Sequence, residues 1–431
     1  METVNVGFYL ENQDISSVDL SQPEDGNPGV GGTHFLFVAL PHYLKKYSQK
    51  YNPIIFANSI DNLPHYIDKF EAKDINKAAR KSLKKKCDIF IYRPTAADLE
   101  KNFYKCIEDL NLKVVAWAHN LPDYKSLTKI QKSEEVHQLV CVGQEQLDRL
   151  RDDKVFKKSR RIFNGFDPTK FIPPEDLEKE KNVVTYIGSL VPTKGFHELA
   201  KAWPRVLDKK PNARLKVIGT GKLYNRSQEL GKWGVASESY EDKFRKYLSD
   251  KNGNIHDSVN FLGLLGKEKI EILQKSTVGV MNPTGKSENC PGSALEIQAC
   301  GTPVVAGAFW GNLDTIVDGK TGLLSKSDKE LADNIVKLLN DEALAAKLGA
   351  NGIEFVKRKF NNKKIIREWT KLFEDIRKSN ILHVNSIQQN PFHKGKYIRE
   401  SLRILKEKVP PLRIFPSLYY LRKFFASKLK N

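Results

Sequence analysis

Residues 285–306 read GKSENCPGSALEIQACGTPVVA and contain three successive local patterns. The polar loop 286–291 shows no hydrophobic period. In 293–300 the apolar spacing predicts a short helix, with a proline and glycines at its ends as start and stop signals. The β-branched run 302–306 predicts a buried strand. The stretch therefore predicts a loop, a helix and a strand in succession.

Two glutamates, Glu288 and Glu296, lie on either side of the predicted helix start. A glycine-containing loop that leads into a helix N-terminus favours an anion such as phosphate, because free N–H groups and the helix dipole point the same way. Carboxylates do not bind phosphate, but they accept hydrogen bonds from hydroxyls, which sugars and riboses offer in pairs. The combination favours a ligand that carries both phosphate and sugar, such as a sugar nucleotide.

Each glutamate also has an ordinary structural interpretation. Ser293 and Glu296 have the S-x-x-E spacing of a capping box, in which the glutamate satisfies only the helix start. Glu288 would then be a solvated loop residue. Taken alone, the two glutamates do not decide between this interpretation and a binding site.

Length and composition indicate two globular domains. The 431 residues are 40% hydrophobic and 29% charged, which is enough chain for two cores and some extra sequence. There is no run of 18 apolar residues and no basic, apolar leader at the N-terminus, so we expect a cytoplasmic protein. The cysteines are odd in number and unclustered, which favours buried thiols over disulfides or a metal site; they are Cys87, Cys106, Cys141, Cys290 and Cys300.

The net charge of +19 is the abnormal property of this composition, and it is unevenly distributed. Residues 381–431 contain 11 Lys and Arg against 2 acidic residues, so they carry +9 of the total. A charge of this size suggests either nucleic acid or an anionic membrane surface as a partner.

In the first half, short apolar runs alternate with helical patterns, which predicts a doubly wound parallel sheet. The first strand, Val4–Leu10, precedes a glycine-rich loop that contains Gly31 and Gly32, and a helix follows. This order suits close approach of the backbone to phosphate. His119 follows the predicted strand 114–118, and ligands of α/β sheets bind at the carboxyl ends of strands. A lone histidine is also commonly structural.

The second half begins with VVTYIGSLVPTKGFHELAKAW, residues 183–203, which predicts a strand, a glycine turn and a helix. Lys194 stands just before this helix, where an ammonium group could meet a phosphate held at the helix start. Two further strands follow, one ending near Gly219 and Gly221 and the other containing Phe261 and Leu262.

In this order the motifs resemble those of the retaining glycosyltransferases of group 1, the sucrose-synthase and mannosyltransferase-like family. Glu288 and Glu296 have the E-x7-E spacing of that family, and the following A-C-G-T-P-V-V also matches it. The turn N-G-F-D at 164–167 is similar to the family's N-G-V-D at its interdomain junction. The resemblance covers about 1–378 and is densest over 183–324.

The resemblance implies the GT-B fold, in which two Rossmann-like, doubly wound domains face a central cleft. We expect an N-terminal acceptor domain at 1–170 and a C-terminal donor domain at 180–360. A crossover helix at about 361–378 would complete the first domain. The basic amphipathic tail, 381–431, falls outside the resemblance.

By the same resemblance, the chain would transfer a sugar from a UDP- or GDP-sugar to a glycan or lipid-linked acceptor with retention, and without a metal or other cofactor. Glu296 would accept hydrogen bonds from the ribose, Glu288 would orient the sugar, and Lys194 would neutralise the phosphates. His119 would face the donor sugar, so that Glu288, Lys194 and His119 take the catalytic roles. The implied donor site comprises Gly31, Gly32, Ser189, Lys194, Gly219, Gly221, Phe261, Leu262, Glu288, Asn289, Cys290, Pro291, Gly292, Ser293, Ala294 and Glu296.

Ser189 departs from the family pattern G-R-L-x-x-x-K-G, whose arginine and lysine hold the diphosphate. Serine supplies no charge and one hydroxyl donor. The change could mean weaker diphosphate binding, a cation from elsewhere in the chain, or lost transfer. A sugar-nucleotide-binding protein with weak or no transferase activity is therefore the alternative function.

The tail mixes aromatic and aliphatic residues with lysine and arginine, and its end, SLYYLRKFFASKLKN, predicts a basic amphipathic helix. Such a helix suits peripheral attachment to anionic lipid at the inner face of a membrane. Docking on the body of the protein is the other interpretation. Nucleic-acid binding would explain the charge but would leave the two glutamates and the glycine loops without a role.

Overall fold

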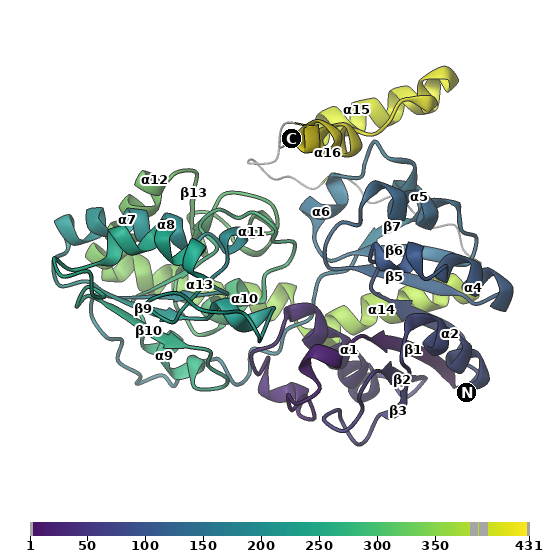
Figure 1. Cartoon of the computed structure of the whole chain (residues 1–431), viewed down its shortest axis with the longest axis horizontal. Helices are drawn as coiled ribbons and strands as arrows, with labels where there is room; N and C mark the ends of the chain where they lie inside the picture. Colours follow the sequence, from purple (N-terminus) through teal and green to yellow (C-terminus); the bar gives the residue numbers. More distant parts are fainter. Residues whose placement is uncertain (1–2, 380–386, 388–394, 429–431) are drawn as a thin grey trace. The chain divides into compact units, whose positions relative to one another are not determined.

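The structure, a computed structural model, describes residues 3–379, 387 and 395–428. The described residues form two compact units (Figure 1). Unit 1 combines the described parts of 1–21, 36–164 and 363–431, and unit 2 combines 22–35 and 165–362. Each unit has its own parallel sheet with helices, so the predicted α/β class with two doubly wound units is confirmed. The central cleft stays a prediction.

Unit 1 contains a sheet of seven parallel strands in the order β3-β2-β1-β4-β5-β6-β7. The central strands are continuous apolar runs, as expected where helices cover both faces of a parallel sheet. The strands are β1 (Val4–Leu10), β2 (Tyr51–Ala57), β3 (Asp68–Glu71), β4 (Ile89–Tyr92), β5 (Val114–Ala118), β6 (Val136–Cys141) and β7 (Ser159–Arg161).

The helices of unit 1 include the segment that follows unit 2 in the chain. This segment begins with α14 (Asn362–Arg377). On α14, Trp369 contacts Trp117 of β5 with ring centroids 5.2 Å apart, and Glu374 accepts a hydrogen bond from the Tyr51 hydroxyl at 2.5 Å. The α-helices are α1 (Gly32–Tyr47, which begins in unit 2), α2 (Ile75–Lys84), α3 (Ala97–Glu100), α4 (Phe103–Leu110), α5 (Tyr124–Lys132), α6 (Gln144–Asp148), α14 (Asn362–Arg377), α15 (Gly395–Lys408) and α16 (Leu418–Lys428). Short 3-10 helices are η1 (Gln13–Ile15), η3 (Lys154–Lys158) and η6 (Pro410–Ile414).

Unit 2 contains a sheet of six parallel strands in the order β10-β9-β8-β11-β12-β13. Its strands are β8 (Val183–Ile187), β9 (Arg214–Ile218), β10 (Val259–Gly263), β11 (Val278–Met281), β12 (Val304–Gly307) and β13 (Gly322–Ser325). Its helices are η2 (Pro23–Asp25), η4 (Pro192–Lys194), α7 (Phe196–Lys209), η5 (Gly221–Leu223), α8 (Glu238–Leu248), α9 (Lys269–Lys275), α10 (Gly292–Ala299), α11 (Asn312–Thr315), α12 (Asp328–Asn340) and α13 (Glu342–Lys359).

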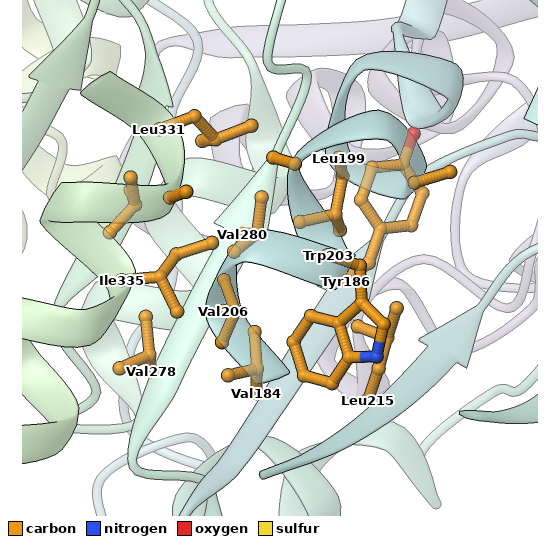
Figure 2. Close-up of a cluster of buried hydrophobic side chains, with 14 of the residues drawn as sticks. Val184, Tyr186, Leu199, Trp203, Val206, Leu215, Val278, Val280, Leu331 and Ile335 are labelled. Atoms are coloured by element: carbon orange, nitrogen blue, oxygen red, sulfur yellow. The ribbon is translucent and has the colours of Figure 1, made fainter. Parts of the chain in front are cut away.

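The core of unit 2 fixes the strands from which the candidate site projects. Figure 2 shows Trp203 of α7 and Ile335 of α12 among side chains of β8, β9 and β11. Trp203 is 1% exposed, and its indole N–H donates to the Ser258 hydroxyl at 2.9 Å. Truncation of such a side chain to alanine costs about 3–5 kcal/mol of stability.

Residues 22–35 pack with unit 2, although the sequence analysis placed them in the first domain. The carbonyl of Asn27 accepts a hydrogen bond from Lys269 on α9 at 3.3 Å. Gly29 has a φ of +96°, and a Cβ there would come within 3.0 Å of the Leu264 side chain. The loop is therefore held by residues that follow β10, which no local sequence pattern reveals.

Of the predicted tail, 381–431, residues 381–386, 388–394 and 429–431 lie outside the described residues. The described part forms α15, η6 and α16 and contacts unit 1: the Tyr419 hydroxyl donates to the Pro122 carbonyl at 3.3 Å. In the part of the chain that the structure describes, no helix is both long and apolar enough to cross a membrane.

Candidate functional site

The loops that follow β8, β9 and β10 are joined at the carboxyl edge of the unit 2 sheet. The amide of Gly188 donates to the Ile218 carbonyl at 3.0 Å, and the amide of Gly219 donates to the Gly263 carbonyl at 2.8 Å. Gly219 has a φ of +144°, and a Cβ there would lie 1.9 Å from the Gly188 carbonyl oxygen. Glycine is therefore required at this position, and it brings the loops that contain Ser189 and Gly221 together.

Ser189 lies inside this group of loops and is only 3% exposed. Its hydroxyl donates to the Thr220 carbonyl at 3.1 Å. The proton of the hydroxyl is thus used to join the loops after β8 and β9. The structure shows no charge at this position that could replace the arginine of the family pattern.

Lys194 ends η4, and the next residue, Gly195, is the N-cap of α7. Gly195 has a φ of +68°, and a Cβ there would come within 2.6 Å of the Thr284 side chain. The glycine therefore permits close approach of this turn to the loop after β11. As a result, the Lys194 ammonium lies 2.6 Å from Oε1 of Glu288.

The Lys194–Glu288 ion pair is largely buried, with side-chain exposures of 19% and 10%. Asn282 also donates to Oε1 of Glu288, at 2.9 Å. Burial lowers the pKa of Lys194, but Glu288 and Tyr224 outweigh it, so the pKa lies above its usual value and the ammonium stays charged at neutral pH. Oε2 of Glu288 makes no hydrogen bond to any described residue, which leaves one oxygen of the carboxylate for another partner.

Glu296 lies one turn inside α10, which begins at Gly292 after an N-cap at Pro291. No side chain caps this helix, so the capping-box interpretation of Ser293 and Glu296 is wrong. Instead, Oε1 of Glu296 accepts a hydrogen bond from the ammonium of Lys269 at 2.8 Å. Both residues are 7% exposed. Oε2 of Glu296 has no hydrogen-bond partner among the described residues.

Lys269 was not predicted as a site residue. It is the first residue of α9 and is buried four positions before Leu273, on the face where an apolar residue is expected. In a chain with 71 Lys and Arg residues, a lysine at an apolar helix position is a weak signal. Its partner Glu296 is 27 residues away, so the pair is not visible as a local motif.

The N-terminus of α10 is the third element of the site. The amides of Gly292, Ser293 and Ala294 make no hydrogen bond to any described residue, as expected for the first turn of a helix. Just before it, the backbone of Asn289 lies against Gly311, where a Cβ would be 2.4 Å from the Asn289 carbonyl carbon. Cys290 and Pro291 are buried. Backbone donors thus accompany the two carboxylates.

The other candidate residues contribute less to the geometry of this site. The ring of Phe261 packs against Phe196 and Trp233 at 5.7 and 6.1 Å between centroids, so its side chain belongs to the core. Leu262 is partly buried. Gly31 lies near Tyr224, 3.7 Å from where its Cβ would be, while a Cβ at Gly32 would meet no atom within 4 Å.

Comparison with known proteins identifies the domain that carries this site. The family model for group 1 glycosyl transferases matches residues 167–355. Residues 167–355 form a group 1 glycosyl transferase domain. The predicted family resemblance is therefore confirmed for the part of the chain that contains both glutamates and both lysines.

Two curated relatives are similar over about half of this chain. The capsular polysaccharide biosynthesis glycosyltransferase CapM of Staphylococcus aureus is 29% identical over 251 residues, which cover 54% of this chain and 60% of CapM. A GDP-mannose-dependent monoacylated phosphatidylinositol monomannoside mannosyltransferase of Corynebacterium glutamicum is 28% identical, and the match covers 55% of this chain and 61% of that protein. The matches thus span about three fifths of each relative.

A solved structure extends the likeness to the fold of both units. HepE of Anabaena, determined in complex with UDP and glucose, matches with a TM-score of 0.62 at 14% identity, covering 86% of this chain and 100% of HepE. The expected GT-B fold is confirmed by this likeness. At such identity the likeness concerns the fold alone.

His119 lies in unit 1, whereas the other candidates lie in unit 2. It follows β5, is 8% exposed, and contacts the rings of Trp117 at 4.4 Å and Phe37 at 5.8 Å. Its role toward a donor sugar stays a prediction. The structure thus brings Glu288, Lys194 and Glu296 together in the glycosyl transferase domain, and adds Lys269.

Proposed function

We propose that the protein transfers a sugar from a nucleoside diphosphate sugar to a glycan or lipid-linked acceptor, with retention of the anomeric configuration. The observation that carries this proposal is the pair of buried lysine–glutamate contacts beside the N-terminus of α10. Each contact uses one oxygen of a carboxylate and leaves the other without a partner among the described residues. Two such carboxylates next to a helix N-terminus suit a ligand with hydroxyls and a diphosphate.

Glu296 is proposed to bind the ribose of the donor. The ammonium of Lys269 holds Oε1 and so orients the carboxylate, and Oε2 can accept a hydrogen bond from a ribose hydroxyl. Hydrogen bonds to a charged acceptor are each worth about 1.5–3 kcal/mol. The lysine in this proposal positions the glutamate and does not itself contact the donor.

Lys194 and the first amides of α10 are proposed to bind the diphosphate. Without a donor, the Lys194 ammonium is neutralised by Glu288. A diphosphate is a second anion within reach of the same ammonium, and its negative charge grows as the sugar leaves. Fixed positive groups at that point lower the barrier, because they stabilise charge that develops in the transition state. Oε2 of Glu288 would then orient the sugar hydroxyls.

Retention and independence of metal ions are parts of the proposal with separate tests. NMR of the glycoside product would show the anomeric configuration of the new linkage, which must match that of the donor sugar if transfer proceeds with retention. Transfer that persists in EDTA would agree with metal independence, whereas recovery with Mg²⁺ or Mn²⁺ after EDTA would refute it.

The nucleotide is proposed to be uridine or guanosine diphosphate. The C. glutamicum relative is named as GDP-mannose-dependent, and HepE was solved with UDP. CapM is named for capsular polysaccharide biosynthesis, which motivates a glycan acceptor. A lipid-linked acceptor would place the enzyme at the inner face of a membrane.

The deciding experiment is a thermal-shift screen of UDP, GDP and their sugars, followed by a transfer assay with the stabilising donor. A ligand at 100 times its dissociation constant stabilises the native state by about 2.7 kcal/mol. Stabilisation by a nucleotide sugar, with release of the nucleoside diphosphate when acceptor is added, supports the proposal. Binding without release, across glycan and lipid-linked acceptors, favours the alternative of a sugar-nucleotide-binding protein. No binding of any nucleotide refutes both.

A further inference from the structure

The end of the chain is attached to unit 1 through a buried aspartate. The side chain of Asp152 is 0% exposed and accepts hydrogen bonds from the Arg399 guanidinium at 2.9 Å and the Leu418 amide at 2.6 Å. Lys406 donates to the Asp152 carbonyl at 3.1 Å. A single residue, Asp152, therefore holds both α15 and the start of α16.

A second set of contacts continues this attachment. Arg151 is 1% exposed and lies 2.6 Å from Asp148 and 3.2 Å from Glu400 of α15. Glu400 in turn lies 2.6 Å from Arg403. Charged residues of α15 thus face the body of unit 1, with Lys396 and Arg399 buried in that helix.

The opposite face of α15 is apolar and exposed. Ile398, Leu405 and Val409 recur at the spacing of one helix face and are 60%, 45% and 38% exposed. After the helix, Ile414 is 83% exposed and Phe415 is 59% exposed. The helix therefore buries its charged face and exposes its apolar face, which is the reverse of the usual arrangement for a surface helix.

Exposed apolar side chains are concentrated in this segment. Of the sixteen large hydrophobic residues that are exposed in the described part of the chain, eight lie within 395–428. We call these eight the tail face; they are Tyr397, Ile398, Ile404, Leu405, Val409, Ile414, Phe415 and Phe425. Exposed apolar side chains that are concentrated in one segment of the chain mark a candidate site of interaction.

The charges around the tail face indicate what covers it. Lys408, Arg413 and Arg422 are exposed and form no ion pair with any described residue. The nearby acid Glu407 is paired with Arg403 at 3.0 Å. A second copy of the chain would bring the same basic residues together across a two-fold axis, which is unfavourable. An anionic lipid surface offers both an apolar layer and neutralising charge.

We propose that the tail face docks on anionic lipid, with its apolar side chains in the headgroup boundary and Lys408, Arg413 and Arg422 at the phosphates. The ion pairs of Asp152 and Arg151 hold α15 and α16 on unit 1 in the orientation that presents this face. The inference does not depend on the proposed transferase activity, because lipid binding is measured without donor or acceptor.

The test is flotation of the full-length protein with vesicles of phosphatidylcholine that contain 30% phosphatidylglycerol. Wild-type protein should float at low salt, and its partition should fall as salt screens the charges. The variant Ile414→Asp/Phe415→Asp should stay at the bottom of the gradient. Lys408→Gln/Arg422→Gln should bind about 25-fold more weakly, since each basic residue contributes about fivefold at such a surface.

Two matched controls separate the tail face from the rest of the surface. Leu83→Asp changes a residue of α2 that is 45% exposed and belongs to another basic helix. Lys251→Gln/Lys347→Gln removes two exposed lysines of unit 2 and the same total charge as the tail variant. Both controls should float like the wild type. Equal thermal midpoints for all variants show that none of them unfolds the protein.

Several outcomes overturn the proposal. Flotation that survives Ile414→Asp/Phe415→Asp, or that Leu83→Asp abolishes, places the lipid contact elsewhere. Equal binding to pure phosphatidylcholine removes the role of the basic residues. Wild-type protein that stays at the bottom, but forms a dimer that Ile414→Asp/Phe415→Asp dissociates, makes the tail face an interface between two copies.

Discussion

Replacement of Lys269 by methionine tests whether the buried pair with Glu296 holds the candidate site together. The two side chains are 9% and 10% exposed, and Nζ and Oε1 are 2.8 Å apart. Methionine has a similar length but no charge, so the variant leaves a buried carboxylate without its partner. Breaking a buried ion pair in this way costs about 3–5 kcal/mol. The Asn27 carbonyl also loses its donor.

The effect is measured by urea unfolding followed by tryptophan fluorescence, to which Trp203, Trp233 and Trp310 of unit 2 contribute beside Trp117 and Trp369 of unit 1. Lys269→Met should lower the free energy of unfolding by about 3 kcal/mol or more. Lys269→Met/Glu296→Gln removes both charges and should recover at least about 2 kcal/mol of that loss.

The matched control is another lysine–glutamate pair on the same helix, α9. Lys275 lies 2.6 Å from Glu271, but the side chains are 37% and 70% exposed. Because solvent screens exposed pairs, Lys275→Met should leave the free energy of unfolding nearly unchanged. A similar loss for Lys275→Met and Lys269→Met, or no recovery in the double variant, would refute the reasoning that burial makes the Lys269–Glu296 pair important.

Three further variants test the site and the fold. Glu296→Ala should weaken binding of the donor nucleotide by at least tenfold, because it removes charge-assisted hydrogen bonds of about 1.5–3 kcal/mol each. Unchanged binding, measured by calorimetry, would contradict the assignment of Glu296 to the ribose. Lys194→Ala should abolish transfer, and substantial activity in this variant would mean that another cation holds the diphosphate. Glu288→Ala should reduce transfer more than it weakens binding of the free nucleoside diphosphate. Burial raises the pKa of Asp98 to about 6, so its contribution to stability is present below about pH 4 and is lost as pH rises to 6. Asp98→Asn should therefore gain up to about 3 kcal/mol over wild type between pH 4 and pH 7, and a pH-independent difference in urea unfolding would contradict this.

Strands in the interior of the sheets could be predicted from sequence with accurate bounds. β1 and β5 are largely apolar runs, and both begin and end at the residues predicted from the sequence. The edge strand β3, with the sequence DKFE, could not be predicted because it lacks an apolar run. It is a strand because its backbone pairs with β2, where Asp68 pairs with Ile54. Backbone pairing with another strand, rather than a local apolar pattern, determines that such a segment is a strand.

The candidate site was predictable in position but not in its contacts. The spacing of Glu288 and Glu296 placed both carboxylates at the start of one helix, and α10 begins within one residue of the predicted start. Lys194 was itself a candidate, but neither ion pair could be predicted, because Lys194 and Lys269 lie 94 and 27 residues away from their glutamate partners. A motif identifies the group that receives a ligand, whereas the group that orients it is often remote in sequence.

The tail shows the limit of amphipathic patterns most clearly. The sequence of α15 separates charged and apolar residues onto two faces, but the pattern does not state which face meets the protein. That choice is made by unit 1, where Asp148 and Asp152 are buried and require cationic partners. Arg151 satisfies Asp148 from within the same segment, while Arg399 reaches Asp152 from 247 residues away. Because the buried carboxylates bind the basic face of α15, its apolar face points outward and is exposed.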